Sequence, residues 1–137
     1  MKGGKRDLHA ACEEGDWQLC LALLERGVDV NARDSNQATP LIRAVICNHV
    51  EVVNILMHLR VKVHCNVYDY DHQGFAAFHW AVILGLVDIV SVMTFLDKSL
   101  LTRADRSGRS PFFLCSVLRP NPQVSLRHPC MVRYILL

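Results

Sequence analysis

One tetrapeptide pattern recurs four times in the 137-residue chain, each time beginning with a large apolar residue and ending with a small one. The copies begin at Leu8, Leu41, Phe78 and Phe112. Their nearly equal spacing is typical of stacked pairs of helices, in which each unit buries its apolar face only against its neighbours. Further apolar residues follow the first three copies at one constant separation, at Leu19, Val52 and Ile89. Two sets of residues with one spacing predict a repeat array.

The residues around these copies suit helices joined by tight turns. Thr39 can cap a helix through its hydroxyl, and Pro40 then occupies the first helical position, where no amide donor is needed. Gly15, Asn48 and Gly85 share one register, at the point where the chain must reverse between two helices. Glycine and asparagine adopt a left-handed backbone most readily, so this pattern predicts a reversal at all three places.

The same segments resemble ankyrin repeats. The run Ala38-Thr39-Pro40-Leu41 resembles the family's turn and helix start, and residues 27–34 resemble its end-of-helix glycine followed by a hairpin. The resemblance implies an all-α ankyrin-repeat solenoid of about four helix-turn-helix units with connecting hairpins. We expect the array to occupy residues 1–118, with units near 5–34, 35–71, 72–105 and 106–118 onward.

The later units depart from the family pattern. The second unit has four extra residues in its hairpin region, and Arg60-Val61 replaces the expected glycine. The third and fourth units have Ala-Ala-Phe-His and Ser-Pro-Phe-Phe where the family prefers Thr-Pro-Leu-His. We therefore expect these units to stack less regularly, and the hairpin from His64 to Gly74 to project further than the others.

The final residues, 119–137, allow two interpretations. Arg119-Pro120-Asn121-Pro122 cannot continue a helix, so an irregular loop is expected there. In the first interpretation, residues 128–136 form the second helix of unit four, because they align with residues 49–57 and place Pro129 at the first helical position. This alignment requires an insertion, since Met131 lies farther along the chain from Phe112 than Val52 lies from Leu41.

In the second interpretation, residues 122–130 resemble the start of a suppressor-of-cytokine-signalling box, at Ser125, Leu126 and Cys130. That box follows ankyrin arrays in one family of ubiquitin-ligase adaptors, where it binds elongin C together with elongin B. Three departures stand against it. Pro129 falls inside the required helix, Tyr134 replaces a small aliphatic residue, and the half that contacts the cullin is absent.

Composition favours an intracellular protein, cytoplasmic or nuclear. No apolar run reaches the roughly 18 residues that a membrane span needs, and the charged residues 1–7 have no apolar stretch behind them as a secretory signal would. Cys12, Cys20 and Cys115 fall in register with apolar residues of other units, so they are expected in the core. We expect all six cysteines to be reduced.

Charge is distributed unevenly along the chain. Up to Asp97 there are 8 Lys and Arg residues against 12 Asp and Glu, whereas 7 basic residues follow from Lys98 onward with the single Asp105. This asymmetry suggests oriented recognition of a partner, or simply solvated charge. A second alternative function is therefore binding of an anionic ligand by the basic half. The chain lacks the lysine clusters and interleaved aromatic residues expected for nucleic acid.

No constellation of residues predicts catalysis, a cofactor or a metal site. The chain has no phosphate-binding glycine loop, and no two of its cysteines are two to four residues apart, as paired zinc ligands are. The resemblance instead places His9 and His79 where ankyrin histidines bond the backbone of a neighbouring unit. We therefore expect a protein without enzymatic activity.

The resemblance places a partner on the concave surface, formed by the hairpins and the exposed side of each first helix. The register assigns to that side Ala10, Glu13, Glu14, Arg43, Ile46, Cys47, Trp80, Ile83, Leu84, Leu114, Val117 and Leu118. The hairpin tips are expected to carry Arg33, Tyr68, Tyr70, His72, Arg103, Arg106 and Arg109. From both sets we predict the partner-binding residues Arg43, Ile46, Tyr68, Tyr70, Trp80, Ile83, Arg106 and Arg109.

Trp80 is the strongest candidate, because tryptophan and arginine are enriched among the residues that dominate binding energy. We expect Trp80→Ala to weaken a complex by more than about 2 kcal/mol with folding largely intact; a core tryptophan is the alternative.

Asn31 resembles the hairpin asparagine that asparaginyl hydroxylases modify. The expected function is a non-enzymatic protein-protein interaction module, and the alternative is a substrate-recruiting adaptor of a cullin-RING ubiquitin ligase.

Overall fold

The structure is a computed structural model and describes residues 7–117. Those residues form seven α-helices and one short 3-10 helix, and no strand occurs among them. The helices are α1 (Leu8–Glu14), α2 (Trp17–Glu25), α3 (Pro40–Ile46), α4 (Val50–Leu59), α5 (Ala77–Ile83), α6 (Val87–Leu96), η1 (Lys98–Thr102) and α7 (Pro111–Val117).

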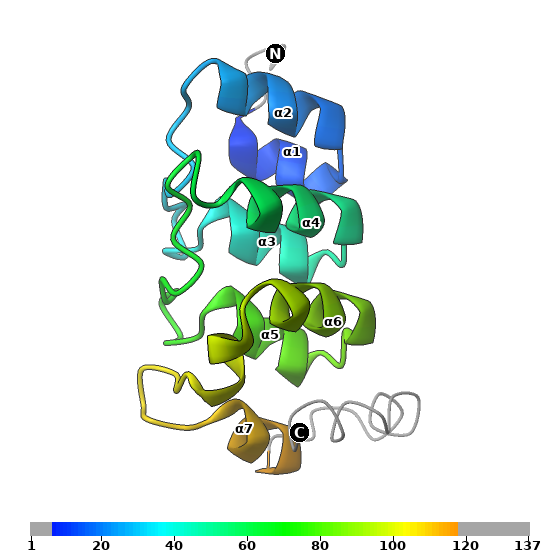
Figure 1. The fold of residues 1–137 in the computed structure, drawn as a ribbon. Helices are drawn as coiled ribbons and strands as arrows, with labels where there is room; N and C mark the ends of the chain where they lie inside the picture. The colour runs from blue at the N-terminus through cyan, green and yellow to red at the C-terminus, as the bar shows by residue number, and fades with distance from the viewer. Residues whose placement is uncertain (1–6, 118–137) are drawn as a thin grey trace.

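The helices stack in two layers (Figure 1). α1, α3, α5 and α7 pack in sequence order to form one layer, and α2, α4 and α6 form the other. Within each of the first three units the two helices contact one another, and the loops that join successive units gather along one side of the stack. This arrangement confirms the predicted all-α solenoid.

Local sequence explains where the helices begin. The side chains of Asp7, Asp16 and Thr39 accept hydrogen bonds from amides in the first turns of α1, α2 and α3. Pro40 follows Thr39 at the first helical position, as predicted. α7 begins in the same way, because Ser110 Oγ accepts from the amide of Phe113 at 3.1 Å. Each cap satisfies an amide that has no partner within its helix.

The reversals between paired helices confirm the predicted left-handed positions. Gly15, Asn48 and Gly85 have φ angles of 76°, 60° and 70°. At the first reversal the space is also restricted, because a Cβ on Gly15 would stand 2.5 Å from the His49 ring. The imidazole of His49 bonds the carbonyl of Glu13 at 2.7 Å, so the first reversal is packed directly against the second unit.

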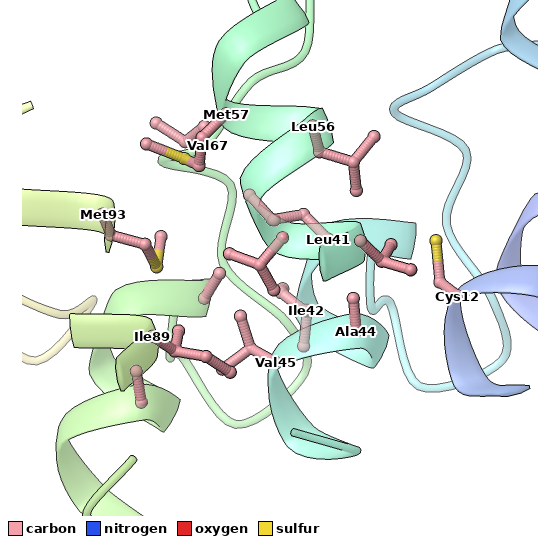
Figure 2. Close-up of a cluster of buried hydrophobic side chains, with 14 of the residues drawn as sticks. Cys12, Leu41, Ile42, Ala44, Val45, Leu56, Met57, Val67, Ile89 and Met93 are labelled. Atoms are coloured by element: carbon pink, nitrogen blue, oxygen red, sulfur yellow. The ribbon is translucent and has the colours of Figure 1, made fainter. Parts of the chain in front are cut away.

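The core runs continuously between the two layers. The first residues of the first three tetrapeptides, Leu8, Leu41 and Phe78, are each 1% exposed. Figure 2 shows side chains from α1, α3, α4 and α6 meeting in one cluster, with Cys12 on one side of α3 and Ile89 on the other. Because the apolar residues of each unit pack against those of the neighbouring units, the units stabilise one another as a stack.

The cysteine predictions are confirmed in part. Cys12 and Cys20 are buried, with their Sγ atoms 3.8 Å apart, whereas Cys115 is only half-buried. The described cysteines, Cys12, Cys20, Cys47, Cys65 and Cys115, are all free thiols. Within residues 7–117, no helix combines the length and apolar character that crossing a membrane requires.

The prediction of a longer hairpin from His64 to Gly74 is wrong for the hairpin turn itself. The extra residues instead form turns directly after α4, where the amide of Cys65 bonds the carbonyl of Arg60 at 2.8 Å. His64 adopts the left-handed backbone, with φ 57°, that Gly27 adopts in the first unit. Arg60 stabilises the site because its guanidinium donates to the carbonyls of Met57 and Leu96, at the ends of α4 and α6.

The fourth unit is represented by α7, which packs on α5 and η1. Phe112 is 45% exposed, although it shares the register of Leu8, Leu41 and Phe78. Those three are covered by the second helix of their own unit, and the helix predicted for residues 128–136 lies outside the described residues. The predicted irregular loop from residue 119 onward lies outside them too.

Candidate protein-binding surface

Three hairpin turns of one design lie along the loop side of the stack. They span residues 34–38, 71–75 and 105–109, and each begins with an aspartate: Asp34, Asp71 or Asp105. In each turn the backbone amide of the aspartate donates to the carbonyl of the fifth residue, and its Oδ1 accepts from the amides of the third and fifth residues. The fourth residue has a positive φ: Gln37, Gly74 or Gly108. The three turns therefore have equal length.

The second carboxylate oxygen of each aspartate holds a large side chain on the surface. Asp34 Oδ2 accepts from Arg43 Nε at 2.6 Å, and Asp71 Oδ2 accepts from Trp80 Nε1 at 2.7 Å. Both donors lie nine residues after their aspartate, on the first helix of the next unit. In the last hairpin that register holds Leu114, which has no donor, and Arg109 Nε donates to Asp105 Oδ2 at 2.8 Å instead.

Arg43 was predicted on the exposed side of its helix, and the structure shows it half-buried and paired with Asp34. Its Nε also lies 3.5 Å from a carboxylate oxygen of Glu13 on α1. Burial by itself raises the pKa of Asp34, but the hydrogen bonds from Arg43 and from two backbone amides outweigh it and hold that pKa below the usual value. Arg43 therefore ties a hairpin to two helices and still presents part of its guanidinium at the surface.

Trp80 belongs to a small aromatic group. Its ring and that of Phe75 meet edge to face, with centroids 5.3 Å apart, and the guanidinium of Arg109 lies 5.4 Å from the Phe75 centroid. Trp80 is half-buried, so neither the fully exposed nor the core alternative describes it.

Four residues of this region were not predicted from the sequence: Phe75 at the surface, and the aspartates Asp34, Asp71 and Asp105 that hold surface side chains. The three aspartates recur along the chain at the same spacing as the tetrapeptide pattern. That shared spacing is the signal that could have indicated them. Phe75 has no counterpart of its kind in the other two turns, so no repeat signal marks it.

The predicted tyrosines lie between successive hairpins and not at a free tip, which corrects the sequence expectation. Tyr68 donates its hydroxyl hydrogen bond to the carboxylate of Asp97, and Tyr70 donates to the carbonyl of Ala104 at 2.9 Å. Both are half-buried. The Tyr68 hydroxyl ties the loop before α5 to the end of α6, the Tyr70 hydroxyl ties it to the loop before α7, and both ring faces remain for other contacts.

Each of these ring faces carries an arginine. The guanidinium carbon of Arg103 lies 3.6 Å from the Tyr68 centroid, and that of Arg106 lies 5.7 Å from the Tyr70 centroid. Both are distances at which a cation is attracted to an aromatic ring. Arg103 and Arg106 are exposed, as predicted for residues at the hairpins.

The remaining predicted contacts lie on the first helices. Ile46 on α3 and Ile83 on α5 are both half-buried, and Ile46 also packs against the core. Exposed Glu13 and Glu14 lie towards the α1 end of this layer. Leu114 is wrong as a surface residue, because it is 0% exposed. We call the set Arg43, Ile46, Phe75, Trp80, Ile83, Arg103, Arg106 and Arg109 the candidate surface.

Histidines connect the units through backbone carbonyls, as the resemblance implied. His9 Nε2 lies 2.9 Å from the carbonyl of Ala38, and His79 Nε2 lies 2.9 Å from that of Arg103. His79 Nδ1 accepts from the amide of Ala76, so Nε2 carries the proton and donates. Burial, more than any other effect, lowers the pKa of His79 below the ordinary histidine value. The imidazole is therefore held neutral.

Asn31 also bridges two units. Its Nδ2 donates to the carbonyl of His64 at 2.8 Å, and its Oδ1 accepts from the amide of Asn66 at 2.7 Å. Hydroxylation of this residue stays a prediction. Ser125, Leu126 and Cys130, predicted for elongin binding, lie outside the described residues, as does Leu118. Within residues 7–117, no three His, Cys, Asp or Glu side chains gather as metal ligands would.

Several known proteins are similar to this chain over part of its length. It is 38% identical over 87 residues to the probable E3 ubiquitin-protein ligase XBOS33 of Oryza sativa subsp. japonica, covering 63% of this chain and 16% of that protein. It is 34% identical over 91 residues to the B-cell lymphoma 3 protein homolog of Mus musculus, covering 66% and 19%.

A viral protein is similar over much the same share. The putative ankyrin repeat protein FPV014 of fowlpox virus is 32% identical over 90 residues, covering 66% of this chain and 20% of that protein. The chain thus spans a fifth or less of the lengths of these relatives. The sequence model of the family described as ankyrin repeats (3 copies) matches residues 8–103, which include the first three helix pairs and η1. The chain belongs to the ankyrin-repeat family.

Proposed function

We propose that this chain binds a partner protein through the candidate surface, with the half-buried apolar side chains at its centre and arginines around them. Ankyrin repeats mediate protein-protein interaction in general, and the particular surface is our inference. The observation that carries it is the set of hydrogen bonds from Arg43, Trp80 and Arg109 to the hairpin aspartates, which we call the aspartate clasps. The clasps hold these three side chains in fixed positions while leaving them partly exposed.

Rigid placement of these side chains favours binding. A long or large side chain loses rotamer freedom when it is buried in a complex, at a cost of about 0.5–1.5 kcal/mol each. Trp80 and Arg43 are already held by hydrogen bonds in the free protein, so most of that cost is met on folding. Both residue types are also enriched among those that dominate interface energies.

The clasp on Trp80 changes the choice of test variant. Trp80→Ala would leave the buried carboxylate of Asp71 without one of its donors, so loss of binding could follow from damage to the fold. Ile83→Asp is cleaner, because Ile83 is half-buried and is not among the residues packed on the core. Glu51→Ala, on the exposed face of α4, is the matched control.

The test is affinity capture from a cell lysate with the intact chain and both variants, each checked by circular dichroism. We expect Ile83→Asp to lose a partner that the intact chain and Glu51→Ala retain, with a helical signal equal in all three. An unchanged set of captured proteins for a folded Ile83→Asp would contradict the proposed surface.

A second candidate function is recruitment of substrates to a cullin-RING ubiquitin ligase. Its support is the resemblance of Ser125, Leu126 and Cys130 to an elongin-binding box, and the names of three relatives that are called, or called probable, E3 ubiquitin-protein ligases. We expect a Leu126→Ala/Cys130→Ala variant to lose purified elongin B/C while keeping its helical signal. Unfolding of that variant would instead support a repeat helix at residues 128–136.

A further inference from the structure

We propose that Arg103, Arg106 and Arg109 form a receptor for an acidic segment of the partner protein. This inference rests on the proposed function and specifies the chemistry of one part of the candidate surface. The three arginines lie within seven residues around the last hairpin turn, 105–109, and each guanidinium lies over an aromatic ring of the loop before α5.

The ring contacts hold the arginines without consuming their hydrogen-bond donors. An attraction between a guanidinium and an aromatic ring face uses the charge of the guanidinium and not its N–H groups. Within residues 7–117 the structure records no hydrogen bond from the Arg103 side chain, one from Arg106 Nη2 to the carbonyl of Asp71 at 3.2 Å, and one from Arg109 Nε to Asp105. Most of the five N–H groups of each arginine are therefore available to a ligand.

Nearby carboxylates are already engaged by other groups. Asp97 accepts from Tyr68 and Ser99, Asp71 accepts from Trp80, and Asp69 pairs with Arg33 at 3.1 Å. Of the three arginines, only Arg109 is paired to a carboxylate in the described part of the chain, through Asp105. Arg103 and Arg106 are thus exposed guanidinium groups with no carboxylate at ion-pair distance among residues 7–117.

The backbone fixes where this charge stands. The amide of Arg106 donates to the carbonyl of Gly74 at 2.9 Å, and a Cβ on Gly74 would lie 3.1 Å from the Cβ of Arg106, so the two hairpins touch directly. Tyr68 and Tyr70, two residues apart, place Arg103 and Arg106 over successive rings. A row of forked donors matches carboxylates spaced along an extended acidic segment.

The experiment titrates the ¹⁵N-labelled protein with decaglutamate and with decaglutamine, following the Nε–Hε signals of its arginines by NMR. We expect decaglutamate to shift the signals of Arg103, Arg106 and Arg109 and to leave that of Arg26, an exposed arginine after α2, in place. Decaglutamine should shift none. Equal shifts at Arg26, or no shift at the three arginines, would overturn the proposal.

Variants separate stacked arginines from general charge. Arg103→Gln/Arg106→Gln should weaken decaglutamate binding about tenfold or more, and Arg26→Gln should leave it unchanged. Arg103→Lys/Arg106→Lys keeps the charge but loses the planar fork, so we expect a loss of affinity here too. Full binding by the lysine variant, or tighter binding of single-stranded DNA of equal charge, would overturn recognition of an acidic protein segment.

These outcomes are distinguishable from failure of the proposed function. If decaglutamate does not shift the three arginine signals while Ile83→Asp still loses the captured partner, the acidic-segment receptor is wrong and the candidate surface stands. If Ile83→Asp keeps every partner and the arginine shifts are seen, the arginine row binds acidic chains independently of the first helices.

Discussion

Asp34, Asp71 and Asp105 show how one residue at a fixed register position organises both fold and surface. Each accepts two amide hydrogen bonds that close a hairpin turn and one side-chain hydrogen bond that orients a surface residue. The side-chain donor is Arg43 for Asp34 and Trp80 for Asp71. For Asp105 it is Arg109, which occupies a different register position. Because a carboxylate oxygen accepts from any suitably placed N–H, the repeat can change its surface residues without changing the turn.

Removing a buried clasp should therefore destabilise the whole fold. Asp71 is 3% exposed and accepts from Gln73, Phe75 and Trp80. We expect Asp71→Ala to lower the free energy of unfolding by about 2–4 kcal/mol, because three donors lose a charged acceptor. Asp69→Ala, which removes a more exposed ion pair, should cost about 1 kcal/mol or less. Urea denaturation measures both, and equal losses would contradict the clasp.

The lowered pKa of His79 should make the stability of the fold depend on pH. Its pKa is lowered in the folded state, chiefly by burial, so the unfolded chain binds a proton at higher pH than the folded chain does. Stability should therefore fall as the pH drops below the unfolded histidine value of about 6.5, and should be insensitive to this group above it.

The check is a comparison of unfolding free energies at mildly acidic and neutral pH for the intact chain and His79→Gln, which cannot titrate. The decrease on acidification should be smaller in the variant. NMR titration of His79 gives an independent reading, and a folded-state pKa at or above the ordinary value would contradict the assignment.

At the scale of elements, the first reversal shows how a turn can be fixed by its neighbour. Gly15 and Gly27 both have a left-handed backbone, with φ angles of 76° and 82°. A Cβ on Gly15 would meet the His49 ring at 2.5 Å, whereas a Cβ on Gly27 would meet nothing within 4 Å. The same glycine requirement therefore has two physical causes, backbone conformation alone at residue 27 and conformation plus packing at residue 15.

Matched alanine substitutions separate the two causes. Gly27→Ala should lower the free energy of unfolding by about 1–2 kcal/mol, the cost of a left-handed backbone for an L-residue. Gly15→Ala should cost at least about 1 kcal/mol more, because the His49 ring must move away from its 2.7 Å contact with the carbonyl of Glu13. Thermal or urea denaturation measures the difference, and equal effects would show that His49 yields freely.

At the scale of the whole molecule, stability depends on how many neighbours cover each unit. α3 contacts α1, α4 and α5, and its residues Leu41, Ile42 and Val45 are at most 1% exposed. α7 packs on α5 and η1, with Phe112 and Phe113 exposed at 45% and 43%. In a stack held together by contacts between neighbouring units, the central units should open least often.

Native-state hydrogen exchange tests this gradient. We expect the amides within α3 and α4 to exchange slowest, and those of α7 to exchange at least about tenfold faster, because among residues 7–117 α7 packs on fewer helices than α3 does. Equal protection throughout would show that the array opens only as one unit.

The sequence alone, through its periodicity and local residue preferences, determined the repeat architecture, the start of α3 and the reversals. These features depend on local chemistry, namely a cap at Thr39, a proline at residue 40 and a left-handed backbone at Gly15, Asn48 and Gly85. These backbone and capping preferences act within a few residues. Because they recur in several units of the repeat, each copy supports the interpretation of the others.

Only the tertiary structure decided what the predicted surface residues contact. Arg43 and Trp80 donate to aspartates of the preceding hairpin. Tyr68 bonds Asp97, just before η1, and Tyr70 bonds the carbonyl of Ala104, just after it. The insertion after α4 likewise extended a turn and not a hairpin, because His64 supplied the left-handed position that Arg60-Val61 does not. A surface side chain is positioned by whichever donor or ring the stacking of units brings near, and that proximity is a property of the folded array.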